Sequence, residues 1–188
     1  LRRGIAEGAL ALHYQPRVRL NDGRPLGLEA LVRWRHSTRG LLPPEEFMPV
    51  VEQSNLSRAF TGQILDTALA RAAQWRQDGH DLPVAVGLRA RDLLDPTLPA
   101  IITAALRENE LPADRLILEI GEQAVAAEPE VSSAAITRLS ELGVGLALDD
   151  FGTGHFPLAQ LAGLPLDEVR LHETFTARLT DGSLDGPT

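Results

Sequence analysis

Short apolar runs recur along the chain at intervals of roughly 30 residues, which is the length of one strand followed by one helix. Three of these runs lie at residues 83–88, 115–120 and 144–149, and amphipathic stretches separate them. Each run is apolar at consecutive positions, as strands are when both faces of a parallel sheet are buried. The pattern therefore predicts a series of βα units built around a parallel sheet.

The beginning of the chain has a different pattern, in which two strands follow each other directly. Residues 10–20 and 26–34 each have the composition of a strand, and Asn21, Asp22 and Gly23 lie between them. Asp-Gly between two such runs is a strong signal for a β-hairpin. The other expected elements are strands at 83–88, 115–120, 144–149 and 167–172 and helices at 45–54, 58–78, 95–109, 129–142 and 155–162.

This order of elements favours a (β/α) barrel over an open doubly wound sheet, because a hairpin comes first and βα units follow. A complete barrel takes about 250 residues, and only about six of its eight strands are found here. We therefore expect an incomplete α/β barrel. The chain starts at Leu1, its only methionine is Met48, and residues 181–188 have the composition of a frayed or cut end. We interpret residues 1–188 as a single domain that lacks the last βα units and belongs to a longer multidomain protein.

Composition and charge exclude several classes of function. The net charge is −8 and all 18 basic residues are arginine, so the chain lacks the basic surface that binding to a nucleic-acid polymer requires. No apolar stretch reaches the roughly 18 residues of a membrane span, and no signal peptide starts the chain. We expect a cytoplasmic domain without direct membrane insertion, either free or tethered through other domains of the full-length protein. The absence of cysteine excludes disulfides, zinc–thiolate sites and thiol catalysis.

Acidic side chains gather where the expected strands end. Glu29 lies inside the apolar run 26–34, Glu119 ends the run that starts at Leu116, and Asp149 and Asp150 end the next run. The carboxyl ends of parallel strands meet at one edge of a barrel, so these carboxylates should converge there. Without a cation they would repel one another, and Mg²⁺, Mn²⁺ or Ca²⁺ is the natural partner of such oxygen ligands. The sequence therefore predicts a divalent cation site.

Taken one at a time, the same residues have simpler interpretations. Glu29 could pair with Arg33, the Asp149–Asp150 pair could form a turn or a helix cap, and Glu122 could be either a solvated acid or one that starts a helix. We expect surface or packing roles for the three histidines without metal-ligand spacing, His13, His36 and His80. The prediction of a site therefore depends on the combination of residues.

Four segments together resemble the ordered motifs of the EAL-domain family. They are Tyr-Gln-Pro at 14–16, Glu-Ala-Leu-Val-Arg-Trp at 29–34, Leu-Glu-Ile at 118–120 and Asp-Asp-Phe-Gly-Thr-Gly at 149–154. The resemblance runs from residue 5 to residue 178. It implies a TIM-like (β/α) barrel whose first strand is antiparallel, and an activity in which cyclic di-GMP is hydrolysed to the linear dinucleotide with Mg²⁺ or Mn²⁺.

The resemblance also implies roles for individual residues. The metal ligands would be Glu29, Glu119, Asp149 and Asp150, with His172 at the position of a further ligand to the second metal. The ligand-binding residues would be Gln15, Leu31, Arg33 and Asp149, with Gln15 and Arg33 near the guanine and phosphate groups. Asp150, Arg170 and Glu122 would belong to the catalytic set, and Glu122 would hold the loop that follows strand 115–120.

Several positions depart from the family pattern. Gly87 stands where the family has a metal-binding asparagine, Gly121 replaces a threonine, and Arg170 and His172 replace the lysine and aspartate of a Lys-Ile-Asp motif. Arginine keeps the positive charge but is bulkier than lysine, and imidazole suits Mn²⁺ better than Mg²⁺. The last family strands, which carry a further glutamate, would lie beyond residue 188. We therefore expect hydrolysis to be weak or lost, together with some or all of the metal binding.

Three functional hypotheses follow. The first is a cyclic di-GMP signalling domain of phosphodiesterase ancestry with degenerate chemistry. The second is a non-catalytic receptor for cyclic di-GMP, or a module for protein–protein interaction whose partner is a second copy or another domain of the same chain. A third hypothesis, a doubly wound Mg²⁺-binding domain, fits less well because paired acids there follow the first strand and not the fifth.

Overall fold

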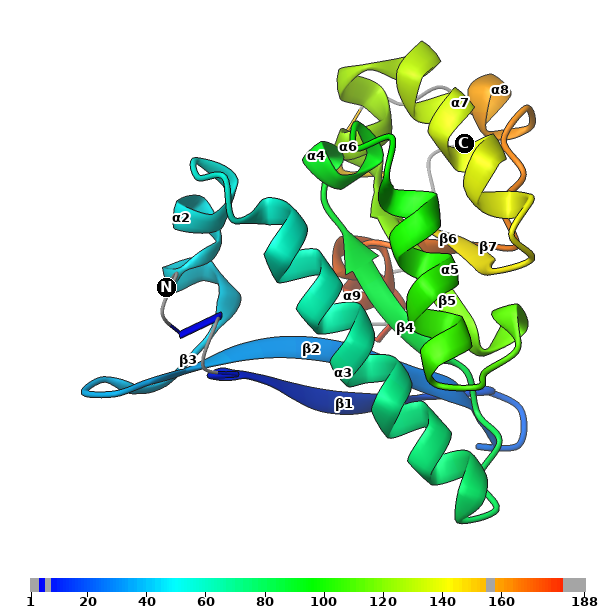
Figure 1. Ribbon diagram of the computed structural model, residues 1–188. Helices are drawn as coiled ribbons and strands as arrows, with labels where there is room; N and C mark the ends of the chain where they lie inside the picture. Colours follow the sequence, from blue (N-terminus) through cyan, green and yellow to red (C-terminus); the bar gives the residue numbers. More distant parts are fainter. Residues whose placement is uncertain (1–3, 6–7, 155–157, 181–188) are drawn as a thin grey trace.

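The computed structural model describes residues 4–5, 8–154 and 158–180, and they form one curled sheet with helices against it (Figure 1). The sheet has seven strands in the order β1-β2-β4-β5-β6-β7, with β3 paired to β2. The strands are β1 (Leu10–Val18), β2 (Pro25–His36), β3 (Gly40–Leu42), β4 (Val84–Leu88), β5 (Leu116–Gly121), β6 (Gly145–Phe151) and β7 (Glu168–Leu171). β1 is antiparallel to β2, and β2, β4, β5, β6 and β7 are parallel. The expected antiparallel first strand and parallel βα units are confirmed.

The opening hairpin turns where the sequence predicts it. The N–H of Arg19 donates to the carbonyl of Arg24 at 2.8 Å, and the N–H of Gly23 donates to the carbonyl of Arg19 at 2.8 Å. Gly23 has φ +69, a conformation that glycine adopts without steric cost. One short strand, β3, was not predicted. It pairs with the last three residues of β2 and carries a single buried residue, Leu42.

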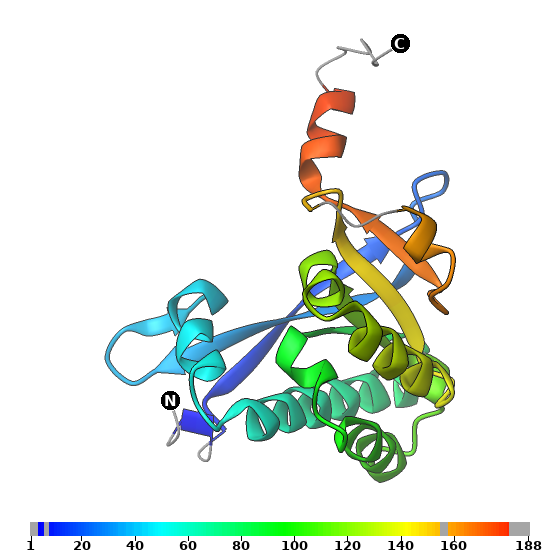
Figure 2. The same cartoon turned by 90° about the horizontal axis from the view of Figure 1, so that it is seen from above.

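The longer helices lie on one face of the sheet. Figure 2 shows α3, α5 and α7 side by side against that face, whereas α9 extends away from the rest of the molecule. These four helices are α3 (Ser57–Gln77), α5 (Leu98–Glu108), α7 (Pro129–Ser140) and α9 (Glu173–Thr180). The shorter ones are η1 (Pro44–Glu46), α2 (Met48–Glu52), α4 (Ala90–Leu93), η2 (Ala113–Arg115), α6 (Glu122–Ala127) and α8 (Leu158–Leu161). None of the described helices combines the length and the hydropathy that a membrane span needs.

The sequence predicted the long helices and missed most short ones. The helix expected at 45–54 is divided into η1 and α2, and Pro49 lies at the start of α2, where its missing N–H is tolerated. α4, α6 and α9 were not predicted, since four to eight residues hold too few turns for a clear helical period. The expected helix at 155–162 is α8 in its described part. Residues 155–157 and the expected frayed end at 181–188 lie outside the described residues.

The two faces of the parallel strands are built from different residues. The face that packs against the helices, called the outer face from here on, carries large buried side chains: Val84, Val86, Leu88, Leu116, Leu118, Ile120, Leu146 and Leu148. The opposite, inner face carries a separate small cluster of Ala85, Ile117 and Ala147. Side chains alternate between the faces along each strand, so one sequence run supplies both.

The sheet curls without closing. Arg17 on β1 forms an ion pair with Glu168 on β7, although these strands stand at opposite ends of the strand order. Figure 2 shows the β7 end of the sheet turned toward the hairpin of β1 and β2. In the described part of the chain no ladder joins β7 to β1. The expectation of an incomplete TIM-like barrel is therefore confirmed.

Candidate functional site

The register of the strands places Glu29 and Glu119 on the inner face. Residues in register between parallel strands point to the same side, and so does every second residue along a strand. Glu29 on β2 is in register with Ala85 on β4, and Gly87, two residues further along β4, is in register with Glu119 on β5. Two glutamates from strands that are not neighbours therefore face a common space.

Two further charged residues join them from β6 and β7. Ala147, which is in register with Glu119, precedes Asp149 by two residues, and Asp149 lines the same pocket as both glutamates. Arg170 on β7 reaches across the inner face, and its guanidinium lies between Glu29 and Glu119. Its Nη1 is 3.2 Å from Oε2 of Glu29, and its Nη2 forms an ion pair with Oε1 of Glu119.

Glu119 is the most deeply buried carboxylate of this group, with 4% of its surface exposed. Burial raises its pKa to about 7, and the nearby charges of Glu29 and Asp149 act in the same direction, while Arg170 lowers the pKa. The positive charge of Arg170 therefore does not fully offset the negative charges of the three carboxylates around this buried position. The site can bind a proton near neutral pH.

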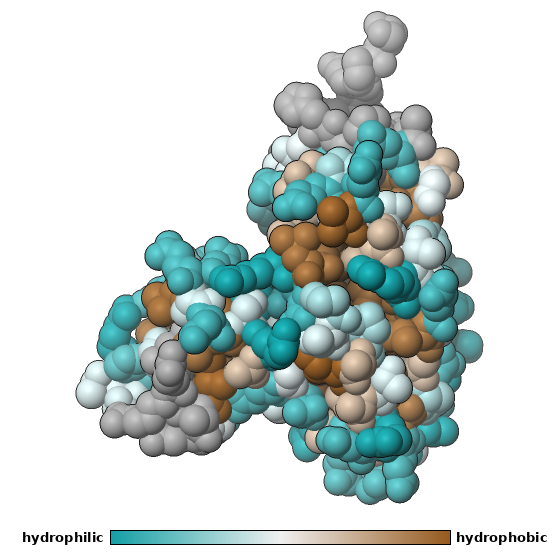
Figure 3. All heavy atoms as spheres, turned by 45° about the horizontal axis from the view of Figure 1, so that its top comes forward, coloured by the Kyte–Doolittle hydropathy of each residue, from teal (hydrophilic) through white to brown (hydrophobic). Residues whose placement is uncertain are grey.

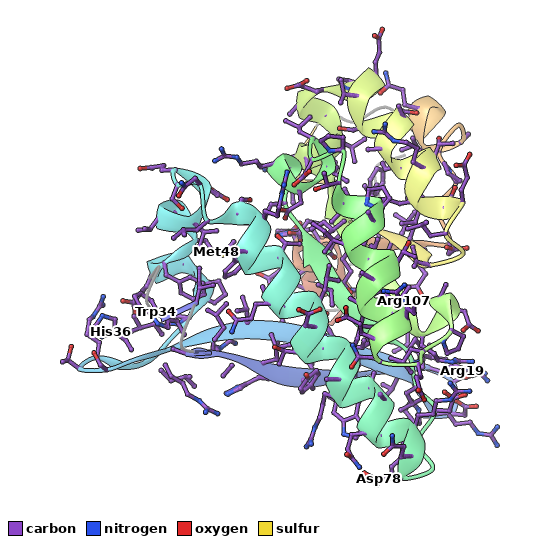
Figure 4. All side chains as sticks on the ribbon, viewed as in Figure 1. Arg19, Trp34, His36, Met48, Asp78 and Arg107 are labelled. Atoms are coloured by element: carbon purple, nitrogen blue, oxygen red, sulfur yellow. The ribbon has the colours of Figure 1, made fainter. Side chains whose placement is uncertain are left out.

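A pocket of about 210 Å³ opens beside these charges. Glu29, Leu31, Arg33, Glu119 and Asp149 line it together with apolar side chains, among them Met48 and Phe60. Figure 4 shows Met48 and Trp34 on the same side of the molecule, toward one end of β2, and Figure 3 shows the surface hollowed between the lobe that carries α2 and the larger lobe. Five of the residues singled out from the sequence therefore share one pocket.

Arg89 and Asp92 form a polar network at the edge of this pocket that the sequence did not predict as a site. Arg89 Nη2 donates to Asp92 Oδ1 at 2.8 Å and to Thr61 Oγ1 at 2.7 Å, and Arg89 Nε donates to Asp92 Oδ2 at 2.9 Å. The guanidinium also stacks over the ring of Phe60 at 4.8 Å. The available signal was a charged residue directly after a buried strand, the same signal that pointed to Glu119 and Asp149.

Glu122 is buried and not solvated. Only 1% of its surface is exposed, and its Oε2 accepts hydrogen bonds from the N–H groups of Gly152, Thr153 and Gly154 at 2.7, 3.0 and 3.2 Å. It starts α6, as expected of a helix-starting acid. The loop that it holds is the one after β6, which corrects the expectation of the loop after strand 115–120. Residues of that held loop directly follow Asp149 and Asp150.

Asp150 and His172 lie outside the pocket. Asp150 is exposed and has φ +56, at an irregularity where the register between β6 and β7 shifts between Leu148 and Phe151. His172 turns toward the start of α9, where its Nδ1 lies 3.1 Å from Thr174 Oγ1 and accepts from the N–H of Thr174 at 3.3 Å. The ring therefore serves the turn into the helix, because a helix start leaves N–H groups without partners.

The other predicted ligand-binding residues on β1 and β2 differ in their exposure and in their contact with the pocket. They are Gln15, Leu31 and Arg33. Gln15 on β1 is in register with Glu29 and is exposed. Leu31 and Arg33 follow Glu29 on the same face of β2, and Arg33 Nη1 donates to the carbonyl of Val32 at 2.8 Å. Arg33 is half-buried at the pocket wall. The suggested pairing of Glu29 with Arg33 is replaced by the pairing of Glu29 with Arg170.

Comparison with known proteins identifies the family, because the family model of the EAL domain matches residues 1–186. The chain belongs to the EAL domain family. This EAL domain is 40% identical over 179 residues to an uncharacterized signaling protein of Caulobacter vibrioides, covering 95% of the chain and 22% of that protein. It is 35% identical over 186 residues to MucR of Pseudomonas aeruginosa, a bifunctional diguanylate cyclase/cyclic di-GMP phosphodiesterase, covering 98% of the chain and 27% of MucR.

Solved structures agree with this assignment. The structure described as the PaMucR phosphodiesterase in complex with c-di-GMP superimposes with a TM-score of 0.90 at 34% identity, covering 97% of the chain and 74% of that structure. The EAL domain therefore spans about a quarter of the two curated relatives and most of a solved EAL structure.

Phosphodiesterases of this family generally depend on a divalent metal, but the donors here do not fit one. Glu29, Glu119 and Asp149 line the same pocket, but in the stretches that the structure describes no three Asp, Glu or His side chains lie close enough together to surround one ion. Arg170 fills the space between Glu29 and Glu119, and Gly87, in register with Glu119, supplies no side-chain oxygen. A Cβ added at Gly87 would meet nothing within 4 Å, so no neighbour fills the space beside that glycine.

Proposed function

We propose that this EAL domain binds cyclic di-GMP at the pocket of the inner face and hydrolyses it slowly or not at all. The observation that carries the proposal is the shared pocket itself. Glu29, Leu31 and Arg33 from one motif, Glu119 from a second and Asp149 from a third line it together, and proteins similar to this chain are described as acting on or binding cyclic di-GMP.

Arg33 and Gln15 supply the polar groups for such a ligand. Arg33 offers a guanidinium at the pocket wall, and guanidinium groups recognise phosphate oxygens with two parallel hydrogen bonds. Gln15 is exposed beside Glu29, where its amide can face a base. The pocket volume of about 210 Å³ lies below the range of about 300 to 1,000 Å³ typical of ligand sites. We therefore place one phosphate and its surroundings in the pocket and the rest of the dinucleotide over its open side.

Weak hydrolysis follows from the charges around the pocket. In-line hydrolysis with two metal ions needs both ions clamped on the reacting phosphate. Glu29 and Glu119 are engaged by Arg170, Gly87 offers no donor, and His172 is directed to α9. These contacts support a site that holds the ligand without the metal ions that would activate an attacking water.

Calorimetry with cyclic di-GMP tests the binding, and an assay for the linear dinucleotide with Mn²⁺ tests the hydrolysis. We expect saturable binding to the unmodified chain and a loss of roughly tenfold or more in Arg33→Ala, the cost of one charged hydrogen-bonding group. Arg107→Ala is the matched control, because Arg107 is exposed on α5 (Figure 4). Rapid turnover with Mn²⁺ would contradict the loss of hydrolysis. A lack of any binding would leave a protein-interaction role as the better hypothesis.

A further inference from the structure

Arg170 has an unusual position for an arginine, on the inner face of the sheet between two carboxylates. Its side chain is 18% exposed, and that of Glu119 is 4% exposed. The two partners come from β2 and β5, which are separated in the sheet by β4. At the level of the pocket, the guanidinium of Arg170 therefore connects β2, β5 and β7, although no two of these strands are neighbours in the sheet.

The charges around it show why a cation is needed there. Glu29, Glu119 and Asp149 approach from β2, β5 and β6, and the like charges of Glu29 and Asp149 act on Glu119. Buried like charges are costly unless a cation or hydrogen bonds compensate them. Among the described side chains, Arg170 is the cation with contacts to both glutamates.

The geometry suits a guanidinium better than a metal ion. Mg²⁺ requires near-octahedral oxygen ligands at about 2.0 to 2.1 Å, whereas a guanidinium is a wide planar fork with donors pointing in different directions. Here the two nitrogens Nη1 and Nη2 address two different carboxylates. Gly87 leaves the neighbouring position on β4 without an oxygen.

We propose that Arg170 is the resident cation of the inner face and takes, between Glu29 and Glu119, the place that a divalent metal ion would otherwise occupy. The arginine then orders the two glutamates without metal and competes with metal for the same oxygens. It acts as a positioning residue. Removing the guanidinium leaves Glu29, Glu119 and Asp149 facing a common space, and it turns a metal-independent site into one that gains from a divalent cation.

Mn²⁺ alone, without nucleotide, provides the test, so that its result is separate from the proposed binding of cyclic di-GMP. The loss of the free Mn²⁺ signal in electron paramagnetic resonance reports binding, and the unfolding midpoint with and without Mn²⁺ reports stabilisation. We expect the unmodified chain to show little change in either. We expect Arg170→Ala to unfold at a lower temperature without metal, to bind Mn²⁺ roughly tenfold more tightly or better, and to regain part of its midpoint when Mn²⁺ is added.

Three further variants separate this role from that of an ordinary ion pair. Arg17→Ala removes the other arginine that connects β7 to the hairpin, and it should lower the midpoint without any gain in Mn²⁺ binding. Arg170→Lys keeps the positive charge but has one ammonium group in place of the two nitrogens that reach Glu29 and Glu119, so its Mn²⁺ binding should lie between those of the unmodified chain and Arg170→Ala. Arg170→Ala combined with Glu119→Gln should lose the gained Mn²⁺ binding.

Two results would overturn the proposal. One is tight Mn²⁺ binding by the unmodified chain that Glu29→Gln or Glu119→Gln abolishes, because the arginine would then not exclude the ion. The other is an Arg170→Ala chain that is less stable and gains no Mn²⁺ binding, because the guanidinium would then be only a strand connector. If Arg170→Ala does not fold, Arg170→Gln keeps the length of the side chain without its charge and gives the same readouts.

Discussion

Leu118 and Glu119 are neighbours on β5, and both are almost fully buried, yet they belong to different environments. Leu118 points to the outer face, where it packs among large apolar side chains of the strands and helices. Glu119 points to the inner face, where its neighbours are Arg170, Glu29 and Asp149. The apolar cluster of that face holds three residues, two of them alanines. Apolar packing on the outer face therefore stabilises the fold. On the inner face, holding buried charges beside a pocket costs part of that stability.

The largest expected effect compares the two faces directly. Leu118→Ala removes a side chain with no exposed surface from the outer core and should lower the free energy of unfolding by about 4 kcal/mol, as large-to-small core substitutions do. Ile117→Ala, one residue earlier and facing inward, should cost about half as much, because fewer atoms surround it. Urea unfolding of both variants measures the difference. Equal losses would show that the inner face packs as tightly as the outer one.

The second prediction concerns the Arg89–Asp92 network. Asp92 is 4% exposed and holds Arg89 in place, so Asp92→Ala leaves a mostly buried guanidinium without its charge partner. We expect a loss of about 3 kcal/mol, the lower end for breaking a buried pair. The matched control is Arg58→Ala, which removes the pair with Asp95 from the side of an arginine that is 62% exposed and leaves the hydrogen bonds from Thr97 to Asp95 in place, with an expected loss of about 0.5 to 1 kcal/mol. Similar losses in the two variants would mean that burial does not set the strength of these pairs.

The third prediction concerns the pH dependence of stability. Burial raises the pKa of Glu119 from 4.5 to about 7, so the folded state binds a proton more tightly than the unfolded state does. The stability contributed by this group is fully present below about pH 4.5 and is lost as the pH rises through about 7. Glu29 on β2 and Asp149 on β6 oppose ionisation, and Arg170 on β7 favours it.

The free energy of unfolding of the unmodified chain should therefore fall by on the order of 2 to 3 kcal/mol between about pH 5 and pH 8. Glu119→Gln should not show this fall, because glutamine does not ionise. Denaturant unfolding across this range measures it, with Glu141→Gln, an exposed glutamate directly after the end of α7, as the control. The prediction fails if the two variants and the unmodified chain show the same slope with pH. Such a result would mean that Arg170 compensates the charges of the inner face fully.

The sequence predicted the features that depend on local periodicity. The hairpin turn at Gly23 follows from Asp-Gly between two strand-like runs, the parallel strands follow from short runs of consecutive apolar residues, and the helices α3, α5 and α7 follow from helical spacing of apolar residues over ten or more positions. β3 and α4 were missed because three or four residues carry no readable period. The strand-end carboxylates Glu119 and Asp149 were also recognisable, since a charge that ends a buried run requires an explanation.

The partners of those charges could not be predicted from sequence. Arg170 and Glu29 are 141 positions apart, and only the curl of the sheet brings β7 opposite β2. The expected ligand His172 directly follows β7, the strand that carries Arg170, but it turns toward Thr174 at the start of α9, and the sequence did not predict that helix. Glu122 has the composition of a surface acid, and its burial depends on a loop that starts 30 positions later.

The smallest effect is expected at the loop after β6, where a residue of the helical layer on the outer face contacts the segment that follows Asp149 and Asp150. Glu122 sits at the start of α6, and its carboxylate gathers three N–H groups from residues that follow Asp149 and Asp150. Gly152 has φ +96, and a Cβ there would come within 2.3 Å of the ring of Phe175. The loop is therefore held on one side by a charge from the helical layer and on the other by α9.

Glu122→Gln keeps the shape of the side chain but replaces the charged acceptor by a neutral one. We expect a loss of about 1 kcal/mol in global stability, the difference between charged and neutral hydrogen bonds. Amide hydrogen exchange should show a larger local effect, with faster exchange at Gly152, Thr153 and Gly154 and little change in β5. Glu130→Gln, an exposed glutamate near the start of α7, serves as the control. Unchanged exchange in the loop would show that Phe175 and the strand ends hold it, and that the helical layer stabilises the inner face without positioning Asp149.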